Sequence, residues 1–245
     1  MPRFFVPTEQ CSEAEVIIRG DDARHIARSL RMAVGDGAVA CDGEGRVFEG
    51  TLSYIRDEEV RLAVHSVSEG AGESPVHITL LMAYPKGDKL EVVVQKAVEL
   101  GAAEIVPFVS SRCVKVPRED KEDARRERLQ RIATEAAKQC GRSRLPTVGH
   151  TLSFADAVRR GAEAELSLLC YEGEHTLSLR RALSGVARPR TVAVMIGSEG
   201  GFSPEEAEAA REAGFLGVHL GERILRCETA PACVLSALSY EWELS

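Results

Sequence analysis

Hydrophobic and polar residues follow two different patterns along the chain, and the change falls near residue 70. Before it, short runs rich in β-branched residues alternate with turn sequences such as 35–37 (GDG) and 42–45 (DGEG). Short runs with Gly and Asp between them predict the strands of a small β-barrel. The expected strands are EVIIR (15–19), AVACD (38–42), RVFEGTLSYI (46–55) and EVRLAVHSV (59–67). One helix, from Asp22 to about Arg31, is expected between the first two.

From His77 onward the apolar runs become continuous and alternate with helical patterns. The expected strands are HITLLMAY (77–84), EIVPFV (104–109), ELSLLCY (165–171), TVAVMI (191–196) and FLGVHL (215–220). Strands buried on both faces and separated by helices indicate a parallel α/β sheet. The segment 88–100 places apolar residues on one helical face, and Gly101 follows as a stop.

The two patterns are separated by the small and polar residues 69–75, which are typical of a linker. We therefore expect a β-barrel domain over residues 1–70 and a parallel-sheet domain over residues 75–245.

Composition places the chain among ordinary globular proteins. Of its 245 residues 44% are hydrophobic, no apolar run approaches the ~20 residues that span a bilayer, and the start MPRFFVPTEQ does not resemble a signal peptide. The seven cysteines form no CxxC pair and lie at no metal-ligand spacing. We expect a cytoplasmic protein with no membrane contact and no metal; Cys140 and Cys227 stay open as reactive thiols.

The distribution of charge is more informative than the formal net charge of −7, which disfavours a protein that coats nucleic acid. Residues 112–146 hold eleven Lys or Arg against six Asp or Glu, whereas residues 199–222 hold six Glu against one Arg. The basic segment is either a localised RNA contact or a solvated helix face.

The sharpest local motif is IGSEGGFSPEE (196–206), in which a buried strand is followed by three glycines and a helix start. Ser203 and Glu206 form a capping-box pattern, and Pro204 suits the first helical position. A glycine loop at the carboxyl end of a parallel strand is a place where such sheets bind ligands. The acidic Glu199 disfavours a phosphate and tolerates a cation such as S-adenosylmethionine. The alternative is a tight turn without a ligand.

A second motif, LGERILRCETA (220–230), again follows a strand and precedes a helix. Ile224 and Leu225 lie within a charged loop, where they either wall a bound adenine or fill the core. Thr229 is expected to cap the helix over residues 231–243.

Four segments together resemble a known family: residues 197–202, LGERILRCETA (220–230), PKGDKLEVVVQKAVELG (85–101), and MPRFF with HIARSLRMAVGD (25–36). They are similar in order and spacing to the ribosomal small-subunit RNA uracil-N3 methyltransferases of the SPOUT superfamily. Ser198 and Pro231 depart from that pattern, where Pro and Ala are usual.

The resemblance implies an N-terminal PUA-like RNA-binding β-barrel and a C-terminal SPOUT domain with a trefoil knot, an arrangement otherwise almost absent from proteins. It implies a homodimer that uses S-adenosylmethionine to methylate N3 of a uridine in the 16S rRNA of the small ribosomal subunit. The cofactor contacts implied by position are Leu169, Tyr171, Glu172, Ile196, Gly197, Ser198, Glu199, Gly200, Gly201, Leu220, Gly221, Ile224, Leu225, Thr229 and Ala230.

Methylation of uracil N3 requires stabilisation of the uracil anion, and an arginine near O2 or O4 would provide it. Arg226 is our first candidate, Arg142 the second and Arg112 the third. Glu228 and Glu199 are the nearest acids for a general base, if one is needed.

Basic and amide side chains outside these loops are candidates for RNA contact. The stretch 135–144 matches a family segment near the substrate, although a helix C-terminus with favourable cations explains it as well. The RNA-binding candidates are Arg24, Arg28, Arg31, Lys86, Gln139 and Arg144.

Three other functions compete with this interpretation. One is a catalytically silent RNA-binding or ribosome-assembly factor that keeps the fold, and another is a related methyltransferase for a different RNA position. The third, an ordinary α/β nucleotide-binding enzyme, lacks support because the chain has no GxGxxG or Walker motif.

Overall fold

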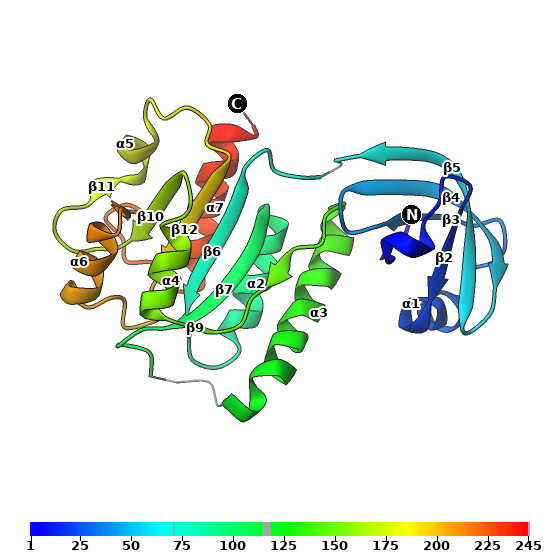
Figure 1. Ribbon diagram of the computed structural model, residues 1–245, viewed down its shortest axis with the longest axis horizontal. Coiled ribbons are helices and arrows are strands. Elements are labelled where there is room, and N and C mark those ends of the chain that lie inside the picture. Colours follow the sequence, from blue (N-terminus) through cyan, green and yellow to red (C-terminus); the bar gives the residue numbers. More distant parts are fainter. Residues whose placement is uncertain (71, 115–118, 245) are drawn as a thin grey trace. The chain divides into compact units, whose positions relative to one another are not determined.

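The computed structural model describes residues 1–70, 72–114 and 119–244 (Figure 1). Its contacts divide the chain into two compact units. Unit 1 comprises Met1–Glu73 and Thr134–Leu145, and unit 2 comprises Ser74–Ala133 and Pro146–Ser245. The barrel and methyltransferase roles given above to residues 1–70 and 75–245 remain predictions.

Unit 1 is built on a five-stranded sheet in the order β1-β3-β4-β5-β2. Its strands are β1 (Arg3–Phe5), β2 (Glu15–Arg19), β3 (Gly37–Cys41), β4 (Arg46–Ile55) and β5 (Glu59–Glu69). Neighbouring strands are antiparallel except β1 and β3, which makes the sheet mixed. The four expected strands are confirmed. β1 was not expected, because three residues are too short to establish an alternating pattern.

The expected helix of unit 1 begins earlier and ends earlier than its sequence indicates. A short 3-10 turn, η1 (Thr8–Gln10), precedes β2, and helix α1 (Gly20–Arg24) follows it. The helix continues as the π-helical turn η2 (His25–Ser29). Ile26 on this turn is buried with Ile18 and Phe48, so the helix covers one face of the sheet.

The second piece of unit 1 is held to the first by several contacts, among them the carboxylate of Glu73 and an ion pair of Lys138 with Asp22. The Glu73 side chain lies 2.8 Å from the Arg142 guanidinium. It also accepts the backbone N–H groups of Ser143 at 2.9 Å and Arg144 at 2.7 Å. Arg142 is only 3% exposed, so this ion pair is a buried structural contact.

Unit 2 contains an eight-stranded sheet in which every pairing is parallel. The order is β11-β13-β10-β12-β6-β7-β8, and β9 pairs with β7. The strands are β6 (His77–Ala83), β7 (Ala102–Val109), β8 (Thr147–Val148), β9 (Leu152–Ser153), β10 (Leu166–Cys170), β11 (Leu177–Ser178), β12 (Thr191–Ile196) and β13 (Leu216–His219). The five expected strands and the parallel sheet are confirmed. The three strands that the pattern missed have two residues each.

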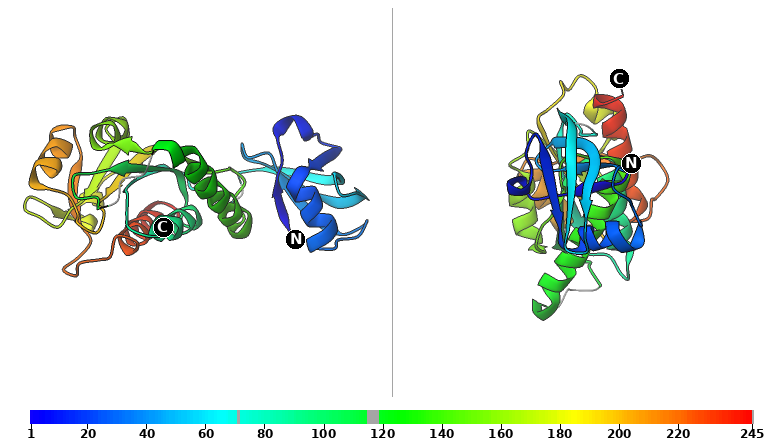
Figure 2. Two further views of the ribbon diagram at one scale, coloured as in Figure 1. Left: turned by 90° about the horizontal axis from the view of Figure 1, so that it is seen from below. Right: turned by 90° about the vertical axis from the view of Figure 1, so that its right-hand side faces the viewer.

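Helices cover both faces of this sheet (Figure 2). The helical elements after β6 are α2 (Lys89–Glu99), the 3-10 turn η3 (Glu119–Lys121), α3 (Glu122–Cys140), α4 (Phe154–Gly161), α5 (Leu179–Leu183), α6 (Pro204–Glu212) and α7 (Thr229–Trp242). Helix α3 passes from unit 2 into unit 1 at Thr134. The inner residues of α4 and α6 share one core with Phe108 and Met195 of the sheet. α2 and α7 pack against each other on the opposite face (Figure 2).

The ends of three helices test the expected stop and cap signals. Gly101 follows α2 with φ +87°, a left-handed conformation that suits glycine at a helix end. The capping box of Ser203 and Glu206 is present at the start of α6. The cap expected at Thr229 is wrong: α7 begins at Thr229 itself, after Glu228, because the N–H of Thr229 already donates to the carbonyl of Arg226 at 2.8 Å.

The trefoil knot stays a prediction. Among the described helices, none combines the length and the apolar character needed to cross a membrane.

Candidate functional site

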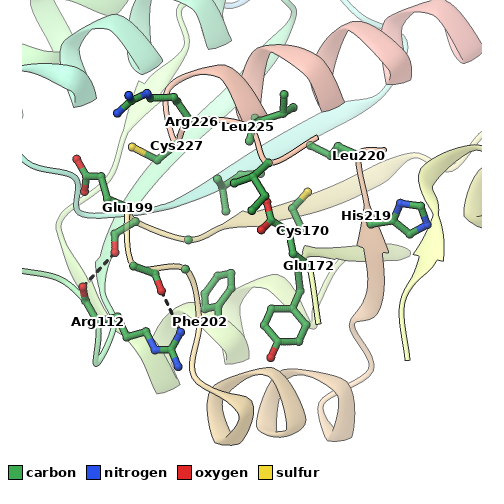
Figure 3. A pocket seen from close by; sticks show the side chains of 18 of the residues that line it. Arg112, Cys170, Glu172, Glu199, Phe202, His219, Leu220, Leu225, Arg226 and Cys227 are labelled. Carbon is green, nitrogen blue, oxygen red and sulfur yellow. Dashed lines mark hydrogen bonds between the residues drawn. The ribbon is translucent and has the colours of Figure 1, made fainter. Parts of the chain in front are cut away.

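A pocket of about 580 Å³ lies at the carboxyl ends of three neighbouring strands, β10, β12 and β13 (Figure 3). Three segments supply most of its wall: residues 170–172, 196–202 and 218–227. Lys89 and Arg112 complete the wall from the chain that follows β6 and β7. All parallel strands end at the same edge of a sheet, so segments far apart in sequence meet here.

The first wall is the glycine loop, residues 197–202. It folds back on itself, and the N–H of Gly201 donates to the carbonyl of Ser198 at 2.9 Å. A Cβ on Gly197 would lie 2.9 Å from the Cα of Gly201, closer than real side chains approach. Gly201 itself has φ +63°. The loop therefore needs glycine for its own geometry and presents backbone to the pocket.

The second wall is the C-terminal loop, residues 220–228. Ile224 is 81% exposed and Leu225 is half-buried, and both line the pocket. Ile224 therefore does not fill the core, which removes one of the two interpretations of this loop. An exposed isoleucine beside a pocket offers apolar surface to a ligand or partner.

A third segment, after β7, is tied to the glycine loop. The Arg112 guanidinium donates to the carbonyl of Gly200 at 3.1 Å, and the Ser198 hydroxyl donates to the carbonyl of Arg112 at 3.3 Å (Figure 3). The buried Glu206 carboxylate accepts the N–H of Ser111 at 2.7 Å as well as that of Ser203 at 3.0 Å. The capping residue of α6 therefore also fixes the neighbouring loop.

A charged group at the rim joins the two loops, and we call it the bridging cluster: Lys89, Glu199, Cys227 and Glu228. The Lys89 Nζ lies 3.0 Å from Glu199 Oε1 and 3.3 Å from Glu228 Oε2. The Cys227 thiol donates to Glu228 at 3.2 Å. Figure 3 shows Glu199 and Cys227 on one side of the pocket, next to Arg226.

The contacts in this cluster fix the protonation of its members. Burial alone would raise the pKa of Glu199, but hydrogen bonds from Lys89 and from the backbone of Lys86 lower it. The hydrogen bond to Glu199 raises the pKa of Lys89. The backbone N–H of Glu228 lowers the pKa of its own carboxyl, and Cys227 and Lys89 contribute. Both carboxylates and the ammonium are therefore charged at neutral pH.

The two thiols of the pocket are poor nucleophiles. Burial raises the pKa of Cys170 and of Cys227 to about 12 in each case. Because the thiolate is the reactive form, a nucleophilic role for Cys227 is disfavoured.

The pocket has the size and the mixed apolar and polar lining of a site for a nucleoside cofactor, and its charged lining residues are Lys89, Arg112, Arg223, Arg226, Glu172 and Glu199. Its volume lies within the range of about 300–1,000 Å³ typical of small-molecule sites. Lys89 is held by two carboxylates and is not free to bind phosphate. Leu220 and Leu225 provide apolar wall, and the loop backbone provides donors and acceptors. The described residues contain no group of three His, Cys, Asp or Glu that could hold a metal ion.

The structure gathers most of the expected cofactor contacts in this pocket. Leu169 and Thr229 are not among the lining residues: Leu169 is fully buried in the sheet core, and Thr229 opens α7. Those that line the pocket are Tyr171, Glu172, Ile196, Gly197, Ser198, Glu199, Gly200, Gly201, Leu220, Gly221, Ile224, Leu225 and Ala230. Their ligand contacts remain predictions.

The three arginines expected to act in catalysis are separated. Arg226 and Arg112 line the pocket. Arg142 belongs to unit 1, where it is buried against Glu73. The catalytic role predicted for Arg142 stays a prediction.

The RNA-binding candidates are placed mainly in unit 1. Arg24 pairs with Asp21 and Arg28 with Asp57, so both guanidinium groups have acidic neighbours. The remaining candidates are exposed: Arg31, Gln139 and Arg144 in unit 1, and Lys86 in unit 2. Their contacts with RNA remain predictions.

Sequence reasoning missed several residues of the site. Lys89 is one polar position at the start of an amphipathic helix, and no local signal distinguishes it from Lys96. Cys170 and His219 end strands whose apolar runs explain them fully. These residues line the pocket because the tertiary fold brings the ends of separate strands and the start of α2 together.

Comparisons with known proteins agree with this geometry. The sequence model of an RNA methyltransferase domain family matches residues 72–239, and that of an RNA methyltransferase PUA domain matches residues 18–64. Fold and site thus define an RNA methyltransferase with an N-terminal PUA domain, which confirms the expected fold class apart from the knot.

Full-length relatives narrow the class. The chain is 33% identical to the ribosomal RNA small subunit methyltransferase E of Bacillus subtilis, over 100% of this chain and 98% of the relative. It is 35% identical to the Synechocystis enzyme of the same name, over 97% and 77% of the two chains. The chain belongs to the ribosomal RNA small subunit methyltransferase E family.

Solved structures of similar proteins show the same fold. A ribosomal RNA small subunit methyltransferase E from Neisseria gonorrhoeae, bound to S-adenosyl methionine, has a TM-score of 0.86 and 30% identity, over 99% of this chain and 98% of that one. A methyltransferase from Legionella pneumophila in complex with bound SAM has a TM-score of 0.86 and 31% identity, over 97% of this chain and 96% of that one.

The double use of Glu206 predicts a stability effect. Glu206→Ala leaves two backbone N–H groups without their acceptor and is expected to lower the free energy of unfolding by about 1–3 kcal/mol. The measurement is urea-induced unfolding. Glu208→Ala, on the same helix but exposed and paired only with Arg211, is the control and should change it by less than about 0.5 kcal/mol. Equal effects of the two substitutions would contradict the role of Glu206.

Proposed function

We propose that this protein transfers the methyl group of S-adenosylmethionine to N3 of a uridine in the 16S rRNA of the small ribosomal subunit. The observation that carries the proposal is the pocket formed by the glycine loop and the C-terminal loop at three adjacent strand ends. Membership of the family over the full chain supports it, as do the relatives named for this substrate class.

The cofactor is expected to be held by the two loops and by residues 170–172. When bound, S-adenosylmethionine supplies a methyl group on a sulfonium that leaves without help from the protein. The role of the chain is to enclose the cofactor and to orient a base towards that methyl group. Such positioning can contribute roughly 7–11 kcal/mol to lowering the barrier.

The substrate base must be unpaired or flipped out, because N3 lies on its Watson–Crick edge. Loss of the N3 proton places negative charge on the uracil, and a nearby arginine stabilises that anion. Arg226 is exposed at the pocket, and within the described residues its side chain has no ion-pair partner. Arg112 is held by the carbonyl of Gly200. We assign the main role to Arg226 and a supporting one to Arg112.

The two acids near the pocket are poorly suited to act as general bases. Glu199 and Glu228 are both ionised partners of Lys89, and their pKa values are lowered by the contacts described above. A weakly basic carboxylate takes up little of the N3 proton. We infer that the base ionises through solvent and that the enzyme stabilises the anion.

Apolar side chains on the surface of unit 2 support a homodimer. Tyr240 on α7 is 70% exposed and Val92 on α2 is 48% exposed, and these two helices pack side by side. The PUA domain of unit 1 is expected to contact RNA, with Arg24, Arg28 and Arg31 as candidates. With the small ribosomal subunit as its substrate, the protein is expected to act in the cytoplasm.

The function is tested by the modified nucleotide. Small subunits from a strain that lacks the protein, incubated with the purified enzyme and S-adenosylmethionine, should gain 3-methyluridine in 16S rRNA by mass spectrometry. No methyl transfer would favour a catalytically silent assembly factor. A different methylated nucleotide would keep the chemistry and change the target.

Arg226→Ala tests the assignment of the arginine. Loss of an anion-stabilising group is expected to slow methyl transfer at saturating cofactor by about 10²–10³-fold, with the cofactor Kd nearly unchanged. The control variant is Arg190→Ala. Arg190 is an exposed arginine that directly precedes β12 and pairs with Glu165. A slower reaction in both variants, or in neither, would contradict the assignment.

The pH profile tests the absence of a carboxylate base. Because the lowered pKa values of Glu199 and Glu228 keep them ionised above the usual carboxyl range, and Lys89 has a raised pKa, none of the three titrates between about pH 6 and pH 9. The single-turnover rate should therefore rise about tenfold per pH unit in this range, following ionisation of N3. A plateau that begins near neutral pH would indicate a general base.

A further inference from the structure

Lys89 is the only member of the bridging cluster that touches both walls of the pocket. It lies at the first position of α2, and Glu199 and Glu228 lie 110 and 139 residues further along the chain. Glu199 belongs to the glycine loop and Glu228 to the end of the C-terminal loop. One ammonium group therefore connects two loops that have no other ion pair between them in the described residues.

The surroundings of these groups limit how well water can replace the contact. The three side chains are only 30%, 27% and 29% exposed for Lys89, Glu199 and Glu228. Glu199 also accepts the backbone N–H of Lys86 at 3.1 Å, which holds its carboxylate in place. Without Lys89, the two partly buried carboxylates, both within 3.3 Å of its ammonium, would lie close together without a cation between them and repel.

We propose that Lys89 is a positioning residue that holds the glycine loop and the C-terminal loop at the separation which the cofactor requires. This inference rests on the proposed function of the pocket. Lys89 acts through the two carboxylates and need not contact the cofactor or the base itself.

A positioning role predicts that loss of Lys89 weakens cofactor binding. The change in charge by itself predicts stronger binding of S-adenosylmethionine, so the two effects can be told apart by experiment. Loss of Lys89 makes the rim more negative, and a more negative rim attracts the cationic S-adenosylmethionine. S-adenosylhomocysteine has the same shape apart from the methyl group and lacks the sulfonium charge. Loss of a positioning residue therefore weakens the binding of both ligands by a similar factor. A purely electrostatic role would instead change mainly the binding of S-adenosylmethionine, which has a net positive charge, because S-adenosylhomocysteine is a zwitterion without net charge.

The experiment is calorimetric titration of the full chain with each of these two compounds. Lys89→Met is expected to weaken both by about tenfold, which lies within the usual coupling of contacting residues. Lys89→Arg keeps the cation and should stay within about twofold of the wild type. Lys96→Met is the matched control, since Lys96 lies on the same helix, pairs among the described residues with Glu99 and does not line the pocket.

Glu228→Gln is a second variant that leaves the contact between Lys89 and Glu199 in place. It should also weaken both ligands, by a smaller factor than Lys89→Met. Thermal unfolding without ligand establishes that each variant is folded. A change confined to S-adenosylmethionine, or equal affinities in Lys89→Met and the wild type, would overturn the positioning role. A wild type that binds neither compound would instead refute the proposed function.

Discussion

The candidate site depends on the register of three parallel strands. Cys170 at the end of β10 is aligned with Ile196 of β12 on one side and with Val218 of β13 on the other. The hydrogen bonds of the sheet thereby bring three strand ends to one level, and the loops that follow them share one space. A change of one residue in this register would exchange the side chains between the two helix-covered faces of the sheet and disrupt the packing on both, so the cores specify it. The glycine loop and the C-terminal loop meet only because this alignment holds.

Around that framework, the partners of individual charged side chains matter more than the net charge of the chain. Glu199 and Glu228 bind Lys89, and Glu206 binds two backbone N–H groups, so three of the acids near the pocket hold loops together. The acidic character of this segment therefore gives little information about the ligand. Arg226 is different, because its exposed side chain is free to meet an anion that forms in the pocket. This contrast is the basis of the proposed division between residues that shape the pocket and one that acts on the base.

Unit 1, which contains the region matched by the PUA domain model, also engages acidic side chains within its own fold. Asp42 accepts three successive backbone N–H groups and pairs with Arg46. Glu73 fastens the residues 142–144. Such carboxylates are engaged within the domain and stabilise its turns.

The sequence by itself determined the longer strands of both sheets, the capping box of α6, the stop at Gly101 and the two loops that line the pocket, because apolar periodicity, caps and glycines act over a few residues. The resemblance to a family supplied the fold class and the chemistry. Only the tertiary structure decided that Arg142 is buried in unit 1, that Ile224 is exposed, and that Lys89 joins the two loops. Those contacts link positions about 70 to 140 residues apart, and no local pattern encodes which partner a side chain will meet. Strand order and crossover connections decide that, because they bring strand ends that are distant in sequence to one edge of a sheet.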